Sequence, residues 1–571
     1  MYLDFMVKIP VNDTKITRKP EGKSVYIYFE YGRKYLPERK YTIPKRVSIG
    51  KQSDEDETMM RPNQNFLLYY PDAQLPEVKG GGLRSSCLRV GAFIVVKRVM
   101  EVYKLKGMLA NYLGEKDAGF FLDLVAYSII CENNAGQYYP DYAYNHPLFT
   151  EGMKVYSDSK VSDFLNGITD EQSIGFLNEW NSTRNHRERI YITYDSTNKN
   201  CQAGDIEIVE YGHAKKDLGL PVFNYSIAYD TYNREPLFYE EYPGSIVDIS
   251  QLQFMLEKAM GYGYKRAGFI LDRGYFSKEN IQYMDKCGYD FVIMVKGMAD
   301  LVNALVLENK GQFENKRGNS IREYKVYGMT VKRKLFASDE TERYFHLFHS
   351  SRKESSERET IEANMEKMAK YLEKQEGQKL SSPKAYEKYF KLFFDKEGKG
   401  EDKVFLFAKE NAAAIERDID LCGYFAIVTS EKMTANEALS LYKSRDASEK
   451  LFRGDKSYLG NKSLRVHSDE SAAAKIFVEF IALIVRSKMY TYLKDEMVKN
   501  DNKANYMTAP VAIRELEKIE MMKLLDSKYR LDHAVTATQK AILKAFKLDP
   551  GYIKKQAGEI SAALSAMKGD E

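Results

Sequence analysis

Three acidic residues in distant parts of the chain have sequence contexts typical of catalytic carboxylates. Asp195 follows the strand-like run Ile190–Tyr194, Asp272 follows the run Gly268–Leu271, and Glu449 lies in a segment with helical spacing. Aspartate is disfavoured inside strands, and functional groups often gather where the strands of an α/β sheet end. If the three carboxylates meet, their oxygen atoms can hold two hard divalent cations, which is the arrangement that supports in-line displacement at phosphorus.

The predicted helix around Glu449 carries cations on the same face as the acid. Five polar residues follow one another at spacings of 3, 4, 4 and 3, which places them within an arc of roughly 80° on a helix: Tyr442, Arg445, Glu449, Arg453 and Lys456. The apolar stripe that would anchor this helix lies on the other side, at Leu441, Ala447, Leu451 and Phe452. A solvated helix with i, i+4 ion pairs has the same pattern. The alternative is that the cations bind a phosphate backbone beside a metal-binding acid.

The segments around these residues predict a mixed sheet. Three strand-like runs follow residue 188, and after them come a helix at 249–260, a strand ending at Asp272, a helix and a further strand, DFVIMVKG. This order predicts an α/β fold, a mixed-sheet core of the ribonuclease H-like type. The strand CGYFAIVTS and one long helix, TANEALSLYKSRDASEKLFRGDK, are expected to complete the core.

The rest of the chain divides by pattern into further segments. We predict a basic β-rich module at 1–80, a helical DNA-binding region at 81–187, the core at 188–300 and 421–495, a β-leaning insertion at 301–420 and a helical C-terminal region at 496–571. A charged helix is expected within the insertion, after residue 350. The stretch from Ala472 to Val485 is interrupted by charges and is predicted to be a buried helix.

Composition excludes several classes of protein. With 571 residues, 44% of them hydrophobic and 29% charged, the chain has the composition of an ordinary globular protein. The net charge of +4 is uninformative, but residues 1–50 hold eleven basic against five acidic side chains. The five cysteines include no C-x-x-C pair, which argues against a zinc ribbon or a disulfide framework. No secretion signal or membrane span is predicted, so we expect a cytoplasmic protein.

The spacing Y-x-x-R-x-x-x-E-x-x-x-x-x-x-K is met at every position by Tyr442, Arg445, Glu449 and Lys456. This series resembles the signature of the bacterial insertion-sequence DDE transposases known as the YREK group. The segments LDRGYFS at Asp272 and YDST at Asp195 resemble the blocks that hold the other two acids of that group. The resemblance covers about residues 190–300 and 420–490.

The resemblance implies a function for each of these residues. Asp195, Asp272 and Glu449 would be the catalytic acids and would bind two Mg²⁺ ions, with Mn²⁺ as a substitute. Tyr442, Arg445, Arg453 and Lys456 would contact double-stranded DNA near the transposon end and the scissile phosphate. Such a transposase cuts the inverted-repeat ends of its element, joins the freed 3′-hydroxyl to target DNA, and works as a homodimer on two ends.

Some relatives of that group pass through a DNA hairpin, for which an aromatic wedge in the insertion is expected. The only tryptophan, Trp180, lies outside the insertion, so Tyr344 or Phe345 is the candidate replacement. The pair His346 and His349 has a zinc-like spacing, but no further histidine or cysteine lies nearby in the sequence, so a structural role is expected.

Two other functions remain open at this stage. One is a domesticated transposase that binds a specific DNA sequence without cutting it. The other is a hydrolase that uses paired carboxylates on a small substrate, such as a glycosidase. That class predicts neither the cations around Glu449 nor the basic N-terminal module.

Overall fold

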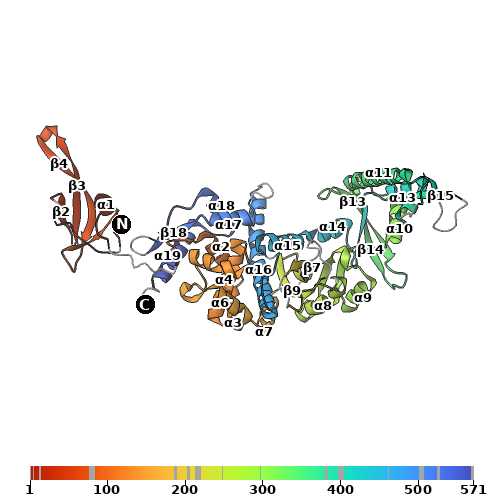
Figure 1. Cartoon of the computed structure of the whole chain (residues 1–571), viewed down its shortest axis with the longest axis horizontal. Helices are drawn as coiled ribbons and strands as arrows, with labels where there is room; N and C mark the ends of the chain where they lie inside the picture. Colours follow the sequence, from red (N-terminus) through yellow and green to blue (C-terminus); the bar gives the residue numbers. More distant parts are fainter. Residues whose placement is uncertain are drawn as a thin grey trace. The chain divides into compact units, whose positions relative to one another are not determined.

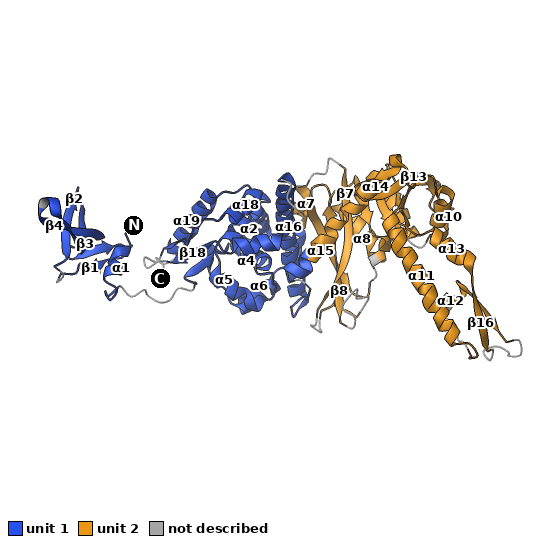
Figure 2. Cartoon of the chain, turned by 90° about the horizontal axis from the view of Figure 1, so that it is seen from above, with its two compact units in different colours: residues 1–176, 454–571 blue, residues 177–453 orange. Residues whose placement is uncertain are grey.

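The structure is a computed structural model. It describes residues 2–3, 5–11, 14–22, 24–75, 84–184, 189–201, 206–211, 220–246, 248–295, 298–379, 384–395, 404–460, 462–500, 507–523 and 528–566. The chain forms two compact units, residues 1–176 with 454–571, and residues 177–453 (Figure 2).

The unit of residues 177–453 is built on one large sheet. Its nine strands lie in the order β12-β13-β14-β17-β11-β10-β7-β8-β9. The strands are β7 (Ile190–Asn200), β8 (Val222–Asp230), β9 (Glu235–Pro243), β10 (Ala267–Leu271), β11 (Asp290–Met294), β12 (Ser320–Ile321), β13 (Val326–Lys334), β14 (Glu342–His349) and β17 (Tyr424–Thr429). Helices α8 (Asp248–Gly261), α9 (Lys278–Cys287) and α10 (Ala299–Asn309) connect them (Figure 1).

The predicted order of three strands, helix, strand, helix and strand is confirmed by β7 to β11. Strands β7, β8 and β9 pair antiparallel, whereas β7, β10 and β11 run parallel to one another. The predicted mixed α/β sheet is therefore confirmed: β7, β10 and β11 form its parallel centre, and antiparallel pairs flank this centre at β7–β8 and at β11–β17. Parallel strands need a crossover connection, and α8 with β8 and β9 supplies it between β7 and β10.

The segment predicted as one long helix is two consecutive helices, so this prediction was wrong. Helix α14 (Ala435–Ser444) ends at Arg445, and α15 (Asp446–Tyr458) follows at once. Two serine hydroxyls bond to nearby carbonyls, from Ser444 to Leu441 at 2.6 Å and from Ser448 to Arg445 at 2.8 Å. Such side-chain bonds compete with the helical pattern and favour a local bend.

The predicted anchoring stripe is also corrected by the structure. Leu451 and Phe452 are buried as expected, but Tyr442, predicted on the polar face, is only 6% exposed. Its ring belongs to the core between α14 and the sheet, together with Ile270, Val292 and Ile427. Tyr442 lies on the buried face of α14, together with Ala435, Ala438 and Leu439.

The segment 301–420 contributes to the central sheet as well as to a separate hairpin. Strands β12 to β14 extend the sheet beyond β17. The charged stretch after residue 350 is helix α11 (Ser351–Lys374), as predicted. It packs with α13 (Ala412–Asp420) against the hairpin of β15 (Phe390–Phe394) and β16 (Phe405–Glu410), and α12 (Lys384–Glu387) precedes this hairpin.

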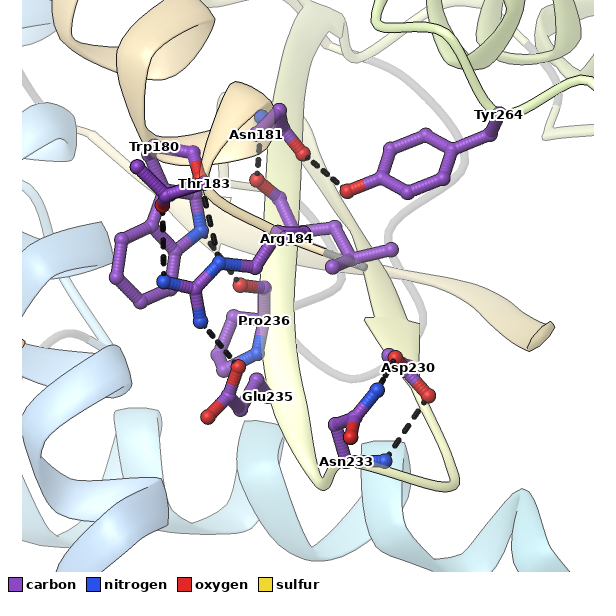
Figure 3. A network of polar contacts seen from close by, with 10 residues as sticks. Trp180, Asn181, Thr183, Arg184, Asp230, Asn233, Glu235, Pro236 and Tyr264 are labelled. Atoms are coloured by element: carbon purple, nitrogen blue, oxygen red, sulfur yellow. Dashed lines mark hydrogen bonds and ion pairs between the residues drawn. The ribbon is translucent and has the colours of Figure 1, made fainter. Parts of the chain in front are cut away.

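Hydrogen bonds and an ion pair connect the end of helix α7 (Asp170–Ser182) to β9 (Figure 3). Trp180 is fully buried, and its Nε1 donates to the Pro236 carbonyl at 3.0 Å. The Arg184 guanidinium stacks on the Trp180 ring at 3.8 Å and pairs with Glu235. The only tryptophan of the chain therefore has a structural role here.

In the other unit, the first 75 residues contain a five-stranded antiparallel sheet in the order β1-β5-β4-β3-β2. Its strands are β1 (Val7–Lys8), β2 (Ile16–Glu21), β3 (Ser24–Leu36), β4 (Tyr41–Gln52) and β5 (Met59–Pro62). A small apolar core around Ile27, Ile49 and Phe66 holds helix α1 (Gln64–Tyr69) on the sheet. The β-rich character predicted from residues 24–49 is confirmed.

The remainder of this unit is mainly helical. It contains α2 (Gly91–Val102), α3 (Leu105–Leu113), α4 (Glu115–Cys131), α5 (Tyr139–Asn145), α6 (Asp158–Asn166), α16 (Asp469–Lys499), α17 (Ala509–Leu516), α18 (Ala537–Ala545) and α19 (Pro550–Ala566). A short sheet of β6 (Cys87–Arg89), β18 (Glu520–Lys523) and β19 (Tyr529–Leu531) joins them. The stretch Ala472–Val485 is buried within α16, as predicted. None of the described helices has the length and apolar character needed to cross a membrane.

Candidate active site

Asp195 and Asp272 are neighbours because of the register between β7 and β10. Leu271 pairs with Tyr194 in this parallel ladder, and each aspartate is the next residue of the chain. Asp272 follows the end of β10 as predicted, whereas Asp195 lies within β7, which continues to Asn200 instead of ending before the acid. Leu271 and Tyr194 are both fully buried. Successive side chains of a strand point to opposite faces, so both aspartates lie on the face opposite these two apolar residues. Their side chains are 16% and 38% exposed.

Glu449 reaches the same place from helix α15. Its carboxylate Oε1 lies 2.7 Å from Nη2 of Arg445, one turn earlier. The side chain of Glu449 is 48% exposed, whereas that of Arg445 is only 15% exposed. The acid therefore lies at the solvent side of the arginine.

Arg445 links all three predicted acids. Its Nη1 lies 3.6 Å from Oδ1 of Asp272 and 3.9 Å from Oδ2 of Asp195. The structure thus brings Asp195, Asp272 and Glu449 together around one guanidinium, which we call the acid cluster. Arg445 is a predicted DNA contact, and in this structure it makes ion pairs with the acids.

Tyr442 completes the surroundings of the acid cluster. Its hydroxyl donates to Oδ1 of Asp272 at 3.5 Å, while its ring is buried in the core. Burial, together with the negative charge of Asp272, raises the pKa of Tyr442 to about 12, so the phenol is neutral. Burial acts to lower the pKa of Arg445, but Asp272, Tyr442, Asp195 and Glu449 outweigh it and raise that pKa.

The donor set of the acid cluster suits a hard divalent cation. All three acids offer carboxylate oxygens, which Mg²⁺ and Mn²⁺ prefer. A cation already lies among them in the form of Arg445. In the described part of the chain no three acidic, histidine or cysteine side chains are close enough together to hold a metal ion. The carboxylates fit a metal by type, but to hold one they would have to give up the guanidinium and move closer together.

The other two predicted DNA contacts lie further along α15. Arg453 is exposed, and no ion pair involves it among the residues that the structure describes. Lys456 is half-buried and belongs to the unit that contains residues 454–571. On a regular helix Lys456 is two turns beyond Glu449 and on the same face.

The candidate wedge residues and the histidine pair lie in β14. Phe345 is fully buried, whereas Tyr344 is half-buried with Lys332 over its ring at 5.0 Å. His346 bonds to Thr330 at 2.9 Å and to Thr429 at 3.0 Å, and His349 bonds to Glu354 at 3.0 Å. Residues three apart in a strand point to opposite faces, so these histidines cannot share a metal.

Sequence reasoning missed the central position of Arg445. The i, i+4 spacing indicated its pair with Glu449. Its approach to Asp195 and Asp272 depends on the register of β7 with β10 and on the packing of α14, and neither leaves a local signal in the sequence.

In comparison with known proteins, the chain matches one protein family. Residues 192–485, more than half of the chain, match the family model described as the transposase DDE domain. Among solved structures, the chain is similar to a piggyBac transposase in a synaptic complex with hairpin DNA, with 7% sequence identity and a TM-score of 0.34 over 83% of this chain and 85% of that one. No curated protein matches the chain.

Proposed function

Because the chain belongs to the transposase DDE domain family, we propose that it is a DNA transposase of a bacterial insertion sequence of the YREK group. The observation that carries the proposal is the meeting of Asp195, Asp272 and Glu449 around one cation. In this proposal the enzyme cuts the inverted-repeat ends of its element. It then joins the freed 3′-hydroxyl to target DNA.

The three carboxylates are proposed to hold two Mg²⁺ ions, with Mn²⁺ as a substitute. When bound, such ions activate the attacking oxygen and stabilise the charge on the leaving oxygen. The residues Asp195, Asp272 and Glu449 orient the reacting phosphate by holding the ions. Tyr442 donates to Asp272 and thereby fixes the orientation of that carboxylate.

Arg445 is proposed to change partners during the reaction. In the present structure it neutralises the acid cluster. With a metal ion held by the carboxylates, the Arg445 guanidinium would be available to a DNA phosphate, for which its planar fork is well suited. Arg453 and Lys456 extend the cationic face along α15 and are proposed to bind the phosphate backbone.

We further propose that the protein binds double-stranded DNA through its basic N-terminal module and acts as a homodimer on two ends. It would work in the cytoplasm, on nucleoid DNA. The runner-up is a domesticated protein that binds DNA without cutting it. One observation favours that alternative: Arg445 occupies the position between the acids and would block the site if it never left.

An excision assay tests the proposal. The substrate is a supercoiled plasmid that carries the reading frame with its flanking genomic DNA, and the reaction contains MgCl₂ or EDTA. We expect Mg²⁺-dependent excision by the wild type and none by Glu449→Gln, with DNA binding retained. Asp446→Asn removes an exposed acid from the start of the same helix and should excise normally. Excision by Glu449→Gln near the wild-type rate would refute the assignment, and a wild type that binds but never cuts would favour the domesticated alternative.

A further inference from the structure

The strands β3 and β4 continue beyond the N-terminal sheet as a two-stranded ribbon, residues 31–46 (Figure 1). The ribbon contains six basic residues and one acid, Glu38. Three of its tyrosines are unusually exposed, at 52% for Tyr31, 58% for Tyr35 and 47% for Tyr41. A ribbon of this charge that leaves aromatic rings in solvent is typical of a surface with a polyanionic partner.

The two faces of the ribbon differ in charge balance. Directly opposite residues of a ladder share a face, so Arg33 lies with Pro44, and the pair Glu30 and Arg46 lies on that same side. There the Nε of Arg33 donates to Glu30 at 2.6 Å, and Arg46 lies 3.7 Å from the same carboxylate. We call this the paired face, because its two arginines already have a counter-ion.

The opposite face holds cations without a counter-ion. Gly32 lies opposite Lys45, Lys34 opposite Ile43, and Leu36 opposite Tyr41. Neither lysine side chain has an ion pair or hydrogen bond within the described part of the chain. The two lysines are diagonal neighbours, an arrangement that costs energy through repulsion unless an anion lies between them. We call this the open face.

The shape of the open face also allows a binding partner to come close to it. Gly32 has no atom within 4 Å of the position where a Cβ would stand, so no side chain obstructs the surface beside Lys45. Ile43 is 39% exposed and Tyr41 47% exposed, and both stand between or beside the lysines. A partner that meets this face therefore encounters two cations, an apolar side chain and an aromatic ring.

We propose that the ribbon 31–46 enters the major groove of duplex DNA with its open face toward the bases and phosphates. The major groove, about 12 Å wide, admits a two-stranded β-ribbon. Lys34 and Lys45 bind phosphates on the groove walls, while Ile43 and Tyr41 contact base edges within it. This inference rests on the proposed function, in which the N-terminal module binds DNA. It adds which residues of the module contact the DNA and which groove they enter.

The test compares two double variants with equal loss of charge. Lys34→Ala with Lys45→Ala removes the two lysines of the open face, and Arg33→Ala with Arg46→Ala removes the two arginines of the paired face. Binding of the full chain to a fluorescein-labelled duplex of mixed sequence is followed by anisotropy at several KCl concentrations. EDTA is present, so that metal-dependent cleavage does not disturb the measurement. The thermal midpoint of each variant verifies that it is folded.

For the open-face variant we expect the slope of log K against log [salt] to fall by about 2, because each lost phosphate contact removes roughly one unit. The paired-face variant should change the slope by much less. Methyl green, a major-groove ligand, should displace the wild type, and the minor-groove ligand netropsin should not. Equal slope changes for the two variants, or displacement by netropsin alone, would overturn the inference.

The binding and excision results together distinguish a failure of this inference from a failure of the proposed function. If the wild type excises DNA but the open-face variant binds like the wild type, only the ribbon assignment fails. A wild type that neither binds duplex DNA nor excises would contradict the proposed function itself.

Discussion

The Nη1 atom of Arg445 lies 3.6 Å from Oδ1 of Asp272, so a cation from the helix pair α14–α15 contacts the acid at the end of β10. The same guanidinium contacts Asp195 and Glu449. The arginine is therefore a shared counter-ion for three carboxylates that come from distant parts of the chain.

Replacing Arg445 by glutamine should make the stability of the protein depend on metal. The variant leaves the three carboxylates without a counter-ion, so its free energy of unfolding in EDTA should fall by about 1–3 kcal/mol. Mg²⁺ should restore more stability in Arg445→Gln than in the wild type, because in the wild type the metal must displace the guanidinium. Urea denaturation with and without MgCl₂ measures both effects. Arg453→Gln, at an exposed position of the following helix α15, is the control. A larger Mg²⁺ effect in the wild type than in Arg445→Gln would contradict the prediction.

Two substitutions of Tyr442 should distinguish what its ring contributes to stability from what its hydroxyl contributes to excision. Tyr442→Phe keeps the buried ring and loses the bond to Asp272, so the free energy of unfolding should change by no more than about 1 kcal/mol while excision slows. Tyr442→Ala should cost about 3–5 kcal/mol, because it leaves a cavity between α14 and the sheet. Wild-type excision by Tyr442→Phe would show that the hydroxyl does not contribute to the reaction.

His346 should make the protein less stable in mild acid. Burial lowers the pKa of His346 to about 4, from an ordinary value of 6.5. The Thr429 hydroxyl donates to the Glu431 carbonyl at 2.7 Å, so it accepts from Nε2 of His346, which fixes a neutral tautomer. Between pH 6.5 and 4, the His346 imidazole therefore binds a proton in the unfolded chain but not in the folded chain.

The stability that neutral His346 contributes is complete above pH 6.5 and is lost as the pH falls toward 4, up to about 3 kcal/mol. His346→Gln should remove this component, so the difference in unfolding free energy between wild type and variant should shrink as the pH falls. Chemical denaturation at pH 7.5, 6 and 5 measures it. A difference that is constant with pH would contradict the prediction.

Asn181→Ala should destabilise the unit of residues 177–453. The buried amide donates to the carbonyls of Leu177 at 2.8 Å and Leu237 at 3.0 Å. Its oxygen accepts from the Tyr264 hydroxyl at 2.7 Å (Figure 3). Its removal leaves buried polar groups without these bonds, at a cost of about 2–4 kcal/mol. Ser182→Ala changes the exposed next residue and should have little effect on urea unfolding. Equal stability of the two variants would show that the Asn181 bonds are dispensable.

Local patterns were sufficient to predict the elements of the core, but not their assembly. The alternation and turn residues around Asp195 and Asp272 predicted β7 to β11 in the right order, because these signals lie within each segment. The attachment of β14 to β17 joins residues such as Phe348 and Phe425, which are far apart in the chain. Such pairing depends on long-range packing, so β12 to β14 were assigned to an insertion instead of the sheet. The break at Arg445 lies between two serine side-chain bonds, which helical periodicity does not reveal.

The parallel ladder between β7 and β10 also determines which changes of chain length the enzyme could tolerate in evolution. A single-residue deletion inside β7 or β10 would turn one aspartate into the apolar interior, whereas extra residues in the β8–β9 hairpin turn at 231–234 would leave Asp195 and Asp272 side by side. Insertions and deletions among related chains should therefore be common in that turn and absent from the two ladder strands.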